Sequence, residues 1–132
     1  MSAADADTLD DIAASGDYMV CACGYVWTRR DQRGKKNTGH VWRICTFLSQ
    51  GNRSAARRRL WHKGRRVYAA RVVWRLTYGP IPYGMQVDHI EGNVLDERPH
   101  MLQLQVCRDN IFNEVRRGRI KWFKPIAKRG SS

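Results

Sequence analysis

A run of alternating residues near the end of the chain constrains the fold more than any other feature. Residues 101–107 read Met-Leu-Gln-Leu-Gln-Val-Cys, and this alternation of apolar and polar side chains predicts a strand with one buried face. Residues 85–88 predict a shorter strand before it, with a loop over 90–99 between the two. Residues 109–117 predict a helix whose apolar side chains share one face. The expected order is therefore strand, loop, strand, helix.

Polar residues stand at the joints of these elements. Asp88 ends the first strand, His89 follows it directly, and Asn110 lies at the start of the helix. Histidine titrates close to neutral pH, so it suits a general base that activates water. A carboxylate and an amide oxygen suit a hard cation such as Mg²⁺, with a substrate phosphate and waters completing its shell. Neighbouring strand residues point to opposite faces, so the three residues fit metal-assisted phosphodiester hydrolysis only if the strand ends there and the backbone bends.

Four motifs follow one another in an order and spacing that resemble the HNH endonuclease family, specifically its phage-type branch. They are Gly-Pro-Ile-Pro at 79–82, Asp-His-Ile-Glu-Gly-Asn at 88–93, Arg-Pro-His-Met-Leu at 98–102 and Arg-Asp-Asn at 108–110. The resemblance covers residues 69–118 and implies a ββα-metal (His-Me finger) nuclease core there. The activity it implies is hydrolysis of DNA phosphodiester bonds, which leaves 3′-hydroxyl and 5′-phosphate ends.

The same resemblance assigns roles to individual positions. Asp88 matches the first metal ligand, His89 matches the general base, and Asn110 matches the second metal ligand. The implied cofactor is Mg²⁺, or Mn²⁺ in its place. Asn93 matches a loop residue that is more structural than chemical.

One position departs from the family pattern. The residue before Leu102 is Asn or His in the family, where it braces the loop and helps to aim the catalytic histidine; here it is Met101, preceded by His100. A methionine side chain forms no useful hydrogen bond. Activity can persist at a reduced level, His100 can substitute, or only DNA binding can remain. We expect some retained activity, because the ligands and the base are intact.

The charge of the chain is large and unevenly placed. The 132 residues carry a formal net charge of +12, yet residues 1–17 contain five Asp and no Lys or Arg. We expect residues 1–17 to be an acidic, flexible tail. Residues 18–68 predict a β-rich basic region, followed by the nuclease core over 69–118 and a basic tail over 119–132. The predicted fold class is α+β.

A body this basic indicates a polyanionic partner, which we expect to be double-stranded DNA. The residues predicted to contact it are Arg57, Arg58, Arg59, Arg65, Arg66, Arg108, Arg116, Arg117, Arg119 and Lys121. One motif supplies one active site, so a monomer or weak homodimer is expected to nick a single strand. The main alternative is a weakly active or inactive DNA-binding protein that keeps a degenerate HNH fold. A weaker alternative is an RNA-binding protein.

Finer elements are also predicted in the first part of the chain. Residues 18–28 and 41–48 indicate strands, the first interrupted by a glycine. His62-Lys63-Gly64-Arg65 indicates a hairpin turn. Residues 69–78 predict a helix that buries Val72, Val73 and Leu76.

Four cysteines and the absence of sorting signals bear on the compartment. There is no secretory signal, so a disulfide framework is not expected. The spacing lacks paired C-x₂-C motifs, so structural zinc is not expected either. The cysteines are predicted to be reduced, buried thiols. No apolar run approaches the length of a membrane span, and the expected location is the cytoplasm, that of a bacterial host if the protein is phage-encoded.

Overall fold

The computed structural model describes residues 3–39, 41–49 and 56–106. In chain order, these residues form α1 (Ala3–Ser15), β1 (Tyr18–Val20), β2 (Val26–Thr28), β3 (Arg43–Ile44), β4 (Phe47–Ser49), β5 (Arg57–His62), β6 (Arg65–Tyr68), α2 (Ala69–Tyr78), β7 (Met85–His89), the 3₁₀ helix η1 (Pro99–Met101) and β8 (Leu102–Val106). The described strands form three antiparallel sheets: β1–β2–β3, β4–β5–β6 and β7–β8. This mixture of helices with antiparallel sheets confirms the predicted α+β class.

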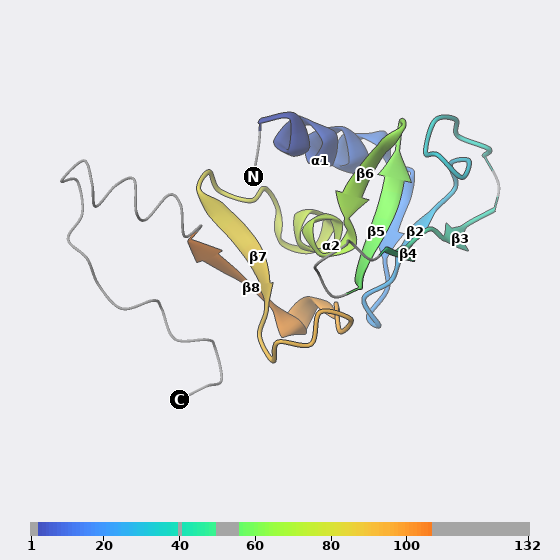
Figure 1. Ribbon diagram of the computed structural model, residues 1–132. Coiled ribbons are helices and arrows are strands. Elements are labelled where there is room, and N and C mark those ends of the chain that lie inside the picture. Colours follow the sequence, from blue (N-terminus) through green and yellow to red (C-terminus); the bar gives the residue numbers. More distant parts are fainter. Residues whose placement is uncertain (1–2, 40, 50–55, 107–132) are drawn as a thin grey trace.

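Helix α2 lies between the β7–β8 pair and the β5–β6 hairpin (Figure 1). Val72 and Val73 are fully buried, and Leu76 and Trp74 pack against the same core. Each fully buried valine contributes about 1.5–3 kcal/mol through removal of apolar surface from water. The helix ends at Gly79, whose φ of 109° takes the chain out of the helical conformation. The predicted helix and its buried stripe are confirmed.

Helix α1 overturns the prediction of a flexible acidic tail. Leu9 and Ile12 are three positions apart, so they share one face of the helix, and each is only 1% exposed. Both belong to the core that also contains Val72 and Val73. The apolar stripe, although short, is enough to fix the helix on the rest of the molecule.

The acidic residues of α1 pair with arginines that lie far away in the sequence. Asp5 lies 3.0 Å from Arg65 of β6 and 3.4 Å from Arg71 of α2, while Asp10 lies 3.3 Å from Arg75 of α2. Exposed pairs of this kind contribute about 0–1 kcal/mol each. Apolar packing therefore holds α1 in place, and its ion pairs orient it over β6 and α2.

A buried histidine also connects α1 to the sheets. His62 is 2% exposed; its Nε2 lies 2.5 Å from Asp11 Oδ2 and its Nδ1 lies 2.8 Å from the Tyr18 hydroxyl. A neutral imidazole satisfies both contacts if Nε2 donates to Asp11 and Tyr18 donates to Nδ1. Burial lowers the pKa of His62, and this outweighs the raising effect of the half-exposed Asp11.

The β5–β6 hairpin has the turn that the sequence predicts. Lys63 and Gly64 have φ values of 49° and 84°, which is the left-handed pair that a two-residue hairpin turn requires. In the register of the sheet, Leu60 pairs with Val67 and both face the core. Alternation directs Arg59 and Trp61 to the opposite, outer face.

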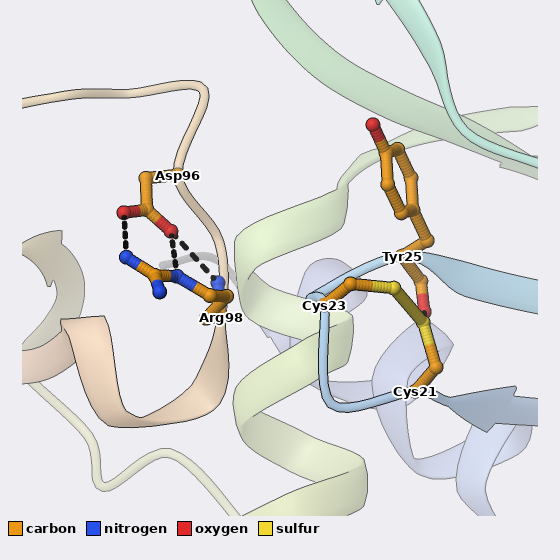
Figure 2. The surroundings of a disulfide bond; sticks show 5 residues. All are labelled: Cys21, Cys23, Tyr25, Asp96 and Arg98. Atoms are coloured by element: carbon orange, nitrogen blue, oxygen red, sulfur yellow. Dashed lines mark hydrogen bonds and ion pairs between the residues drawn. A yellow bond between two sulfur atoms is a disulfide. The ribbon is translucent and has the colours of Figure 1, made fainter.

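The predicted strand over residues 18–28 is a hairpin instead, and its turn contains a disulfide. Cys21 and Cys23 are joined in the turn between β1 and β2 (Figure 2), which corrects the prediction of reduced thiols at these two positions. The turn closes through a hydrogen bond from the Gly24 N–H to the Cys21 carbonyl, 2.9 Å long. It brings the two Cα atoms to 5.4 Å, inside the range that a disulfide spans.

Cys45 is a free, half-buried cysteine, and burial raises the pKa of its thiol to about 12. Cys107 and the predicted helix over 109–117 lie outside the described residues. The predicted strand over 41–48 is divided into β3 and β4, which pair with different partners. Across the described ranges, no helix is both long enough and apolar enough to cross a membrane.

Candidate active site

The β7–β8 hairpin carries Asp88 and His89 at the last two positions of β7. Asp88 pairs with Gln103, and His89 pairs with Leu102. Because side chains alternate along a strand, the two residues point to opposite faces. The His89 side chain is 8% exposed and faces the core side with Leu102. On the other face, Asp88 Oδ2 accepts a hydrogen bond of 3.1 Å from the Gln103 side-chain amide.

The chain turns immediately after His89. The His89 carbonyl accepts a 2.9 Å hydrogen bond from the Gly92 N–H, and the Ile90 N–H donates to the Met101 carbonyl at 2.9 Å. Gly92 has a φ of 74°, which a glycine adopts without strain. β7 therefore ends at His89, which is the first of the two expected conditions. The second, a bend between Asp88 and His89, is not found, because both residues keep regular strand register and opposite directions.

The loop from Asn93 to Arg98 is built from local contacts. The Asn93 side-chain oxygen accepts from the Leu95 N–H at 3.1 Å, and the Asn93 carbonyl accepts from the Asp96 N–H at 3.0 Å. The Arg98 guanidinium donates to both carboxylate oxygens of Asp96, at 2.8 and 2.7 Å, and lowers the pKa of that carboxyl to about 2. The contacts of Asn93 are those of a residue that shapes a turn.

Glu97 is a site residue that the sequence reasoning missed. It is 3% exposed, and its Oε2 lies 3.8 Å from His89 Nε2. Its other oxygen, Oε1, is buried without a hydrogen-bond partner among the described residues, and the same is true of His89 Nε2. One signal was available in the sequence. If Asp96 and Arg98 pair on the outside of the loop, the residue between them tends to face inward.

His89 and Glu97 line a cavity of about 190 Å³. Its walls come from β5, from the junction of β6 and α2, from β7 and from the loop that follows β7. The lining residues are Arg57, Arg58, Tyr68, Ala70, Arg71, Gln86, Val87, His89, Val94 and Glu97. The cavity therefore places an imidazole and a carboxylate beside three guanidinium groups, a combination suited to an anionic ligand that undergoes proton transfer.

Comparison with known proteins identifies the segment that forms most of this site. Residues 67–105 match the sequence model of the HNH endonuclease family. We refer to residues 67–105 as the HNH segment. The match runs from the end of β6 into β8 and includes Asp88, His89 and Glu97.

A phage protein is similar to this chain in sequence, and a solved structure aligns with it. A stretch of 41 residues is 42% identical to Protein 3.8 of Escherichia phage T7, and covers 31% of this chain and 34% of that protein. The chain thus spans about a third of that curated relative. A solved structure that describes DNA binding and cleavage by the HNH homing endonuclease I-HmuI aligns with 81% of this chain and with 56% of the I-HmuI chain. The two chains have 20% sequence identity, and the TM-score is 0.47.

Backbone hydrogen bonds of Met101 close the loop between β7 and β8. The Met101 carbonyl accepts from Ile90, and its N–H donates to the Arg98 carbonyl at 2.8 Å. His100, in η1, is exposed. The hairpin beside His89 is therefore closed without a hydrogen bond from the side chain at position 101.

The proposed metal ligands are only partly within the described residues. Asp88 offers carboxylate oxygens, which a hard divalent cation favours. Asn110 lies outside the described residues. Within residues 3–39, 41–49 and 56–106, no three His, Cys, Asp or Glu side chains are grouped so that they could hold a metal ion. The donor chemistry of Asp88 fits such a cation, but a complete ligand set needs residues from outside these ranges or from the substrate.

The five described arginines of the predicted DNA-binding set differ in their surroundings. Arg57 and Arg58 line the cavity, and Arg58 also lies 4.8 Å from the centre of the Tyr25 ring. Arg59 lies on the face of β5 away from Leu60 but is only partly exposed, and its Nε is buried. Arg66 is exposed, whereas Arg65 pairs with Asp5 of α1. The other predicted contacts lie outside the described residues; these are Arg108, Arg116, Arg117, Arg119 and Lys121.

Proposed function

We propose that this protein is a divalent-metal-dependent DNA endonuclease of the HNH type. The observation that carries the proposal is the position of His89 within the HNH segment, at the end of β7 and in the wall of an arginine-lined cavity. Arg57, Arg58 and Arg71 supply positive charge at this cavity. Their guanidinium groups suit a phosphodiester, because planar donors bind phosphate oxygens in pairs.

In the proposed reaction, His89 removes a proton from a water molecule. The water oxygen then attacks phosphorus and the bond between phosphorus and the 3′ oxygen breaks. This leaves a 5′-phosphate end, and the leaving oxygen takes a proton from solvent water to give the 3′-hydroxyl end. General base catalysis by a positioned side chain contributes about 10²–10⁴-fold to the rate. The arginines of the cavity bind the phosphate and neutralise its charge.

Asp88 and Asn110 would hold the cation, which is Mg²⁺ or Mn²⁺. When bound, the cation supplies positive charge that stabilises the leaving 3′ oxygen. The Gln103 side-chain amide fixes the orientation of the Asp88 carboxylate through their 3.1 Å hydrogen bond. Asp88 would bind the cation and His89 the water. Because the two side chains leave β7 on opposite faces, the proposal requires the substrate phosphate to lie beyond the end of the strand, between them.

The outer face of β4–β5–β6 supports double-stranded DNA as the partner. Arginine and aromatic side chains alternate there: Phe47 stacks on Trp61 with ring centres 6.2 Å apart, and Arg59 lies 4.8 Å from the centre of the Tyr68 ring. Arg66 is opposite Trp61 in the sheet register. Arginines of this kind bind the phosphate backbone, which gives salt-dependent affinity with little sequence preference. One active site per chain favours nicking by a monomer or weak homodimer.

A plasmid assay tests the proposal. Supercoiled plasmid is incubated with the protein in Mg²⁺ or Mn²⁺, and the nicked circles are tested for extension by a DNA polymerase, which needs a 3′-hydroxyl. We expect nicked, extendable product that EDTA abolishes and that Asp88→Ala strongly reduces. Nicking that is unaffected by EDTA or by Asp88→Ala would contradict the metal-dependent mechanism.

A second function is favoured by Met101, which cannot supply the side-chain hydrogen bond of the family residue at this position. A protein of this second kind binds DNA through the same arginines and does not cleave it. Tight, salt-sensitive binding of duplex DNA without nicking in Mg²⁺ or Mn²⁺ would establish this alternative.

A further inference from the structure

We propose that Glu97 is the positioning residue of His89, accepting a hydrogen bond from its Nε2–H so that Nδ1 carries the lone pair. The inference rests on the proposed function, in which His89 is the general base. Glu97 lies inside the HNH segment, between two of its motifs and in neither of them. It is the burial of Glu97 beside His89 that assigns it a role.

The burial of the Glu97 carboxylate needs an explanation. A carboxylate is almost never buried without a partner, because loss of its hydration is unfavourable. The His89 imidazole lies beside it, with 3.8 Å between Glu97 Oε2 and His89 Nε2. Both side chains are under a tenth exposed. His89 Nε2 and Glu97 Oε1 are both buried and each lacks a hydrogen bond within the described residues, so each group has unused bonding capacity.

The backbone at Glu97 is fixed from two sides. On one side, Asp96 and Arg98 pair with each other, as Figure 2 shows. On the other side, Gly24 approaches so closely that a Cβ there would lie 2.4 Å from the Glu97 carbonyl carbon and 2.5 Å from the Arg98 nitrogen. The turn that contains Cys21 and Cys23 therefore supports the backbone of Glu97 from behind. The Glu97 side chain lies in the cavity wall, as does that of His89.

A small side-chain movement completes the contact. A hydrogen bond from Nε2–H to a carboxylate is about 2.7–2.9 Å long, so closure by about 1 Å from 3.8 Å is enough. Catalytic contacts commonly tighten when substrate binds. A carboxylate bonded to one ring nitrogen selects the tautomer in which that nitrogen carries the hydrogen. Glu97 then determines both the orientation of the ring and which nitrogen has the lone pair.

Positioning and purely structural roles predict opposite effects on stability. If Glu97 acts on catalysis, its imperfectly paired buried carboxylate destabilises the fold, and an apolar residue of similar length leaves the melting temperature unchanged or raises it. If Glu97 is instead structural, the same substitution lowers the melting temperature. We therefore use Glu97→Met, which lacks the carboxylate, and Glu97→Gln, which keeps a carbonyl acceptor. Glu91→Gln, in the exposed part of the same loop, is the matched control.

Three measurements on the full chain test the proposal. Plasmid nicking in Mg²⁺ gives kcat and KM, thermal unfolding gives Tm, and ¹⁵N NMR of the imidazole gives the tautomer of His89. We expect Glu97→Met to lower kcat about 10–100-fold with KM for DNA unchanged and Tm not lowered. Glu97→Gln should retain more activity than Glu97→Met, and Glu91→Gln should match the wild type. The neutral imidazole should carry its hydrogen on Nε2 in the wild type and on both nitrogens, in a mixture, in Glu97→Met.

The outcomes separate this inference from the proposed function. Three results would each overturn the role of Glu97. In Glu97→Met, kcat could equal that of the wild type, or its loss could be accompanied by a lower Tm and a higher KM. In the wild-type protein, the neutral imidazole of His89 could carry its hydrogen on Nδ1. Nicking that His89→Ala leaves unchanged, or no nicking by any variant, would overturn the proposed function instead. The NMR measurement still reports on the Glu97–His89 contact in that case.

Discussion

Replacement of Gly24 by alanine is a direct test of how the loop behind the candidate active site is supported. Gly24 has a φ of 86°, and an added Cβ would meet the Glu97 and Arg98 backbones at 2.4–2.5 Å. Gly16 has a φ of 71°, but a Cβ there would find open space. The pair therefore shares the backbone strain of alanine in the left-handed region and differs only in the steric clash.

The expected magnitudes follow from that difference. Left-handed backbone destabilises a residue other than glycine by about 1–2 kcal/mol, and this applies to both variants. Forcing a methyl group into packed backbone adds about 1–3 kcal/mol, and this applies to Gly24→Ala alone. We expect urea unfolding to give a loss of about 1–2 kcal/mol for Gly16→Ala and an additional loss of about 1–3 kcal/mol for Gly24→Ala.

The clash should also move Glu97, since it falls on the Glu97 carbonyl group. Gly24→Ala is therefore expected to lower the plasmid-nicking rate at a temperature where the variant is still folded, whereas Gly16→Ala leaves the rate at the wild-type value. Equal losses of unfolding free energy in the two variants would refute the close approach between the β1–β2 turn and the loop.

Three further predictions concern α1, the buried histidine and the DNA surface. Leu9→Ala should reduce the unfolding free energy by about 2–5 kcal/mol, while Leu95→Ala, at a position 41% exposed, should change it little; equal effects would contradict the packing of α1. Stability should fall as the pH is lowered from 7.5 to 5, because burial lowers the pKa of His62 and the unfolded chain takes up a proton first. Below pH 4 a further loss is expected from Asp11, whose pKa is lowered to about 2, chiefly by its hydrogen bond to His62; a urea midpoint independent of pH would contradict both. Arg66→Ala should weaken duplex DNA binding and reduce the slope of log K against log salt by about 1; an unchanged slope would remove Arg66 from the DNA contacts.

Elements with a strong local signal were predictable from the sequence. The turn at Lys63 and Gly64 was identified because few residues adopt two successive left-handed conformations. The helix α2 and its buried Val72 and Val73 followed from helical periodicity. The β7–β8 pair followed from the alternation over 101–107, since one face of that strand must be buried.

Features set by distant contacts were not predictable. The five aspartates of residues 1–17 predict a flexible, solvated tail, whereas in helix α1 Asp5 pairs with Arg65, sixty positions away. The cysteine prediction relied on the absence of a secretory signal, which bears on the redox compartment and not on the tight turn that places Cys21 beside Cys23. Glu97 was missed because its burial depends on the β1–β2 turn, which no local pattern connects to the HNH segment.

The most direct test of the central claim is the single-turnover rate of plasmid nicking in Mg²⁺ for the wild type, His89→Ala and His100→Ala. His100 is exposed and lies in the same segment, so its substitution controls for the loss of a histidine there. We predict that His89→Ala loses about 10²–10⁴-fold in rate while His100→Ala nicks at close to the wild-type rate. Equal rates for His89→Ala and the wild type would contradict the assignment of His89 as the general base.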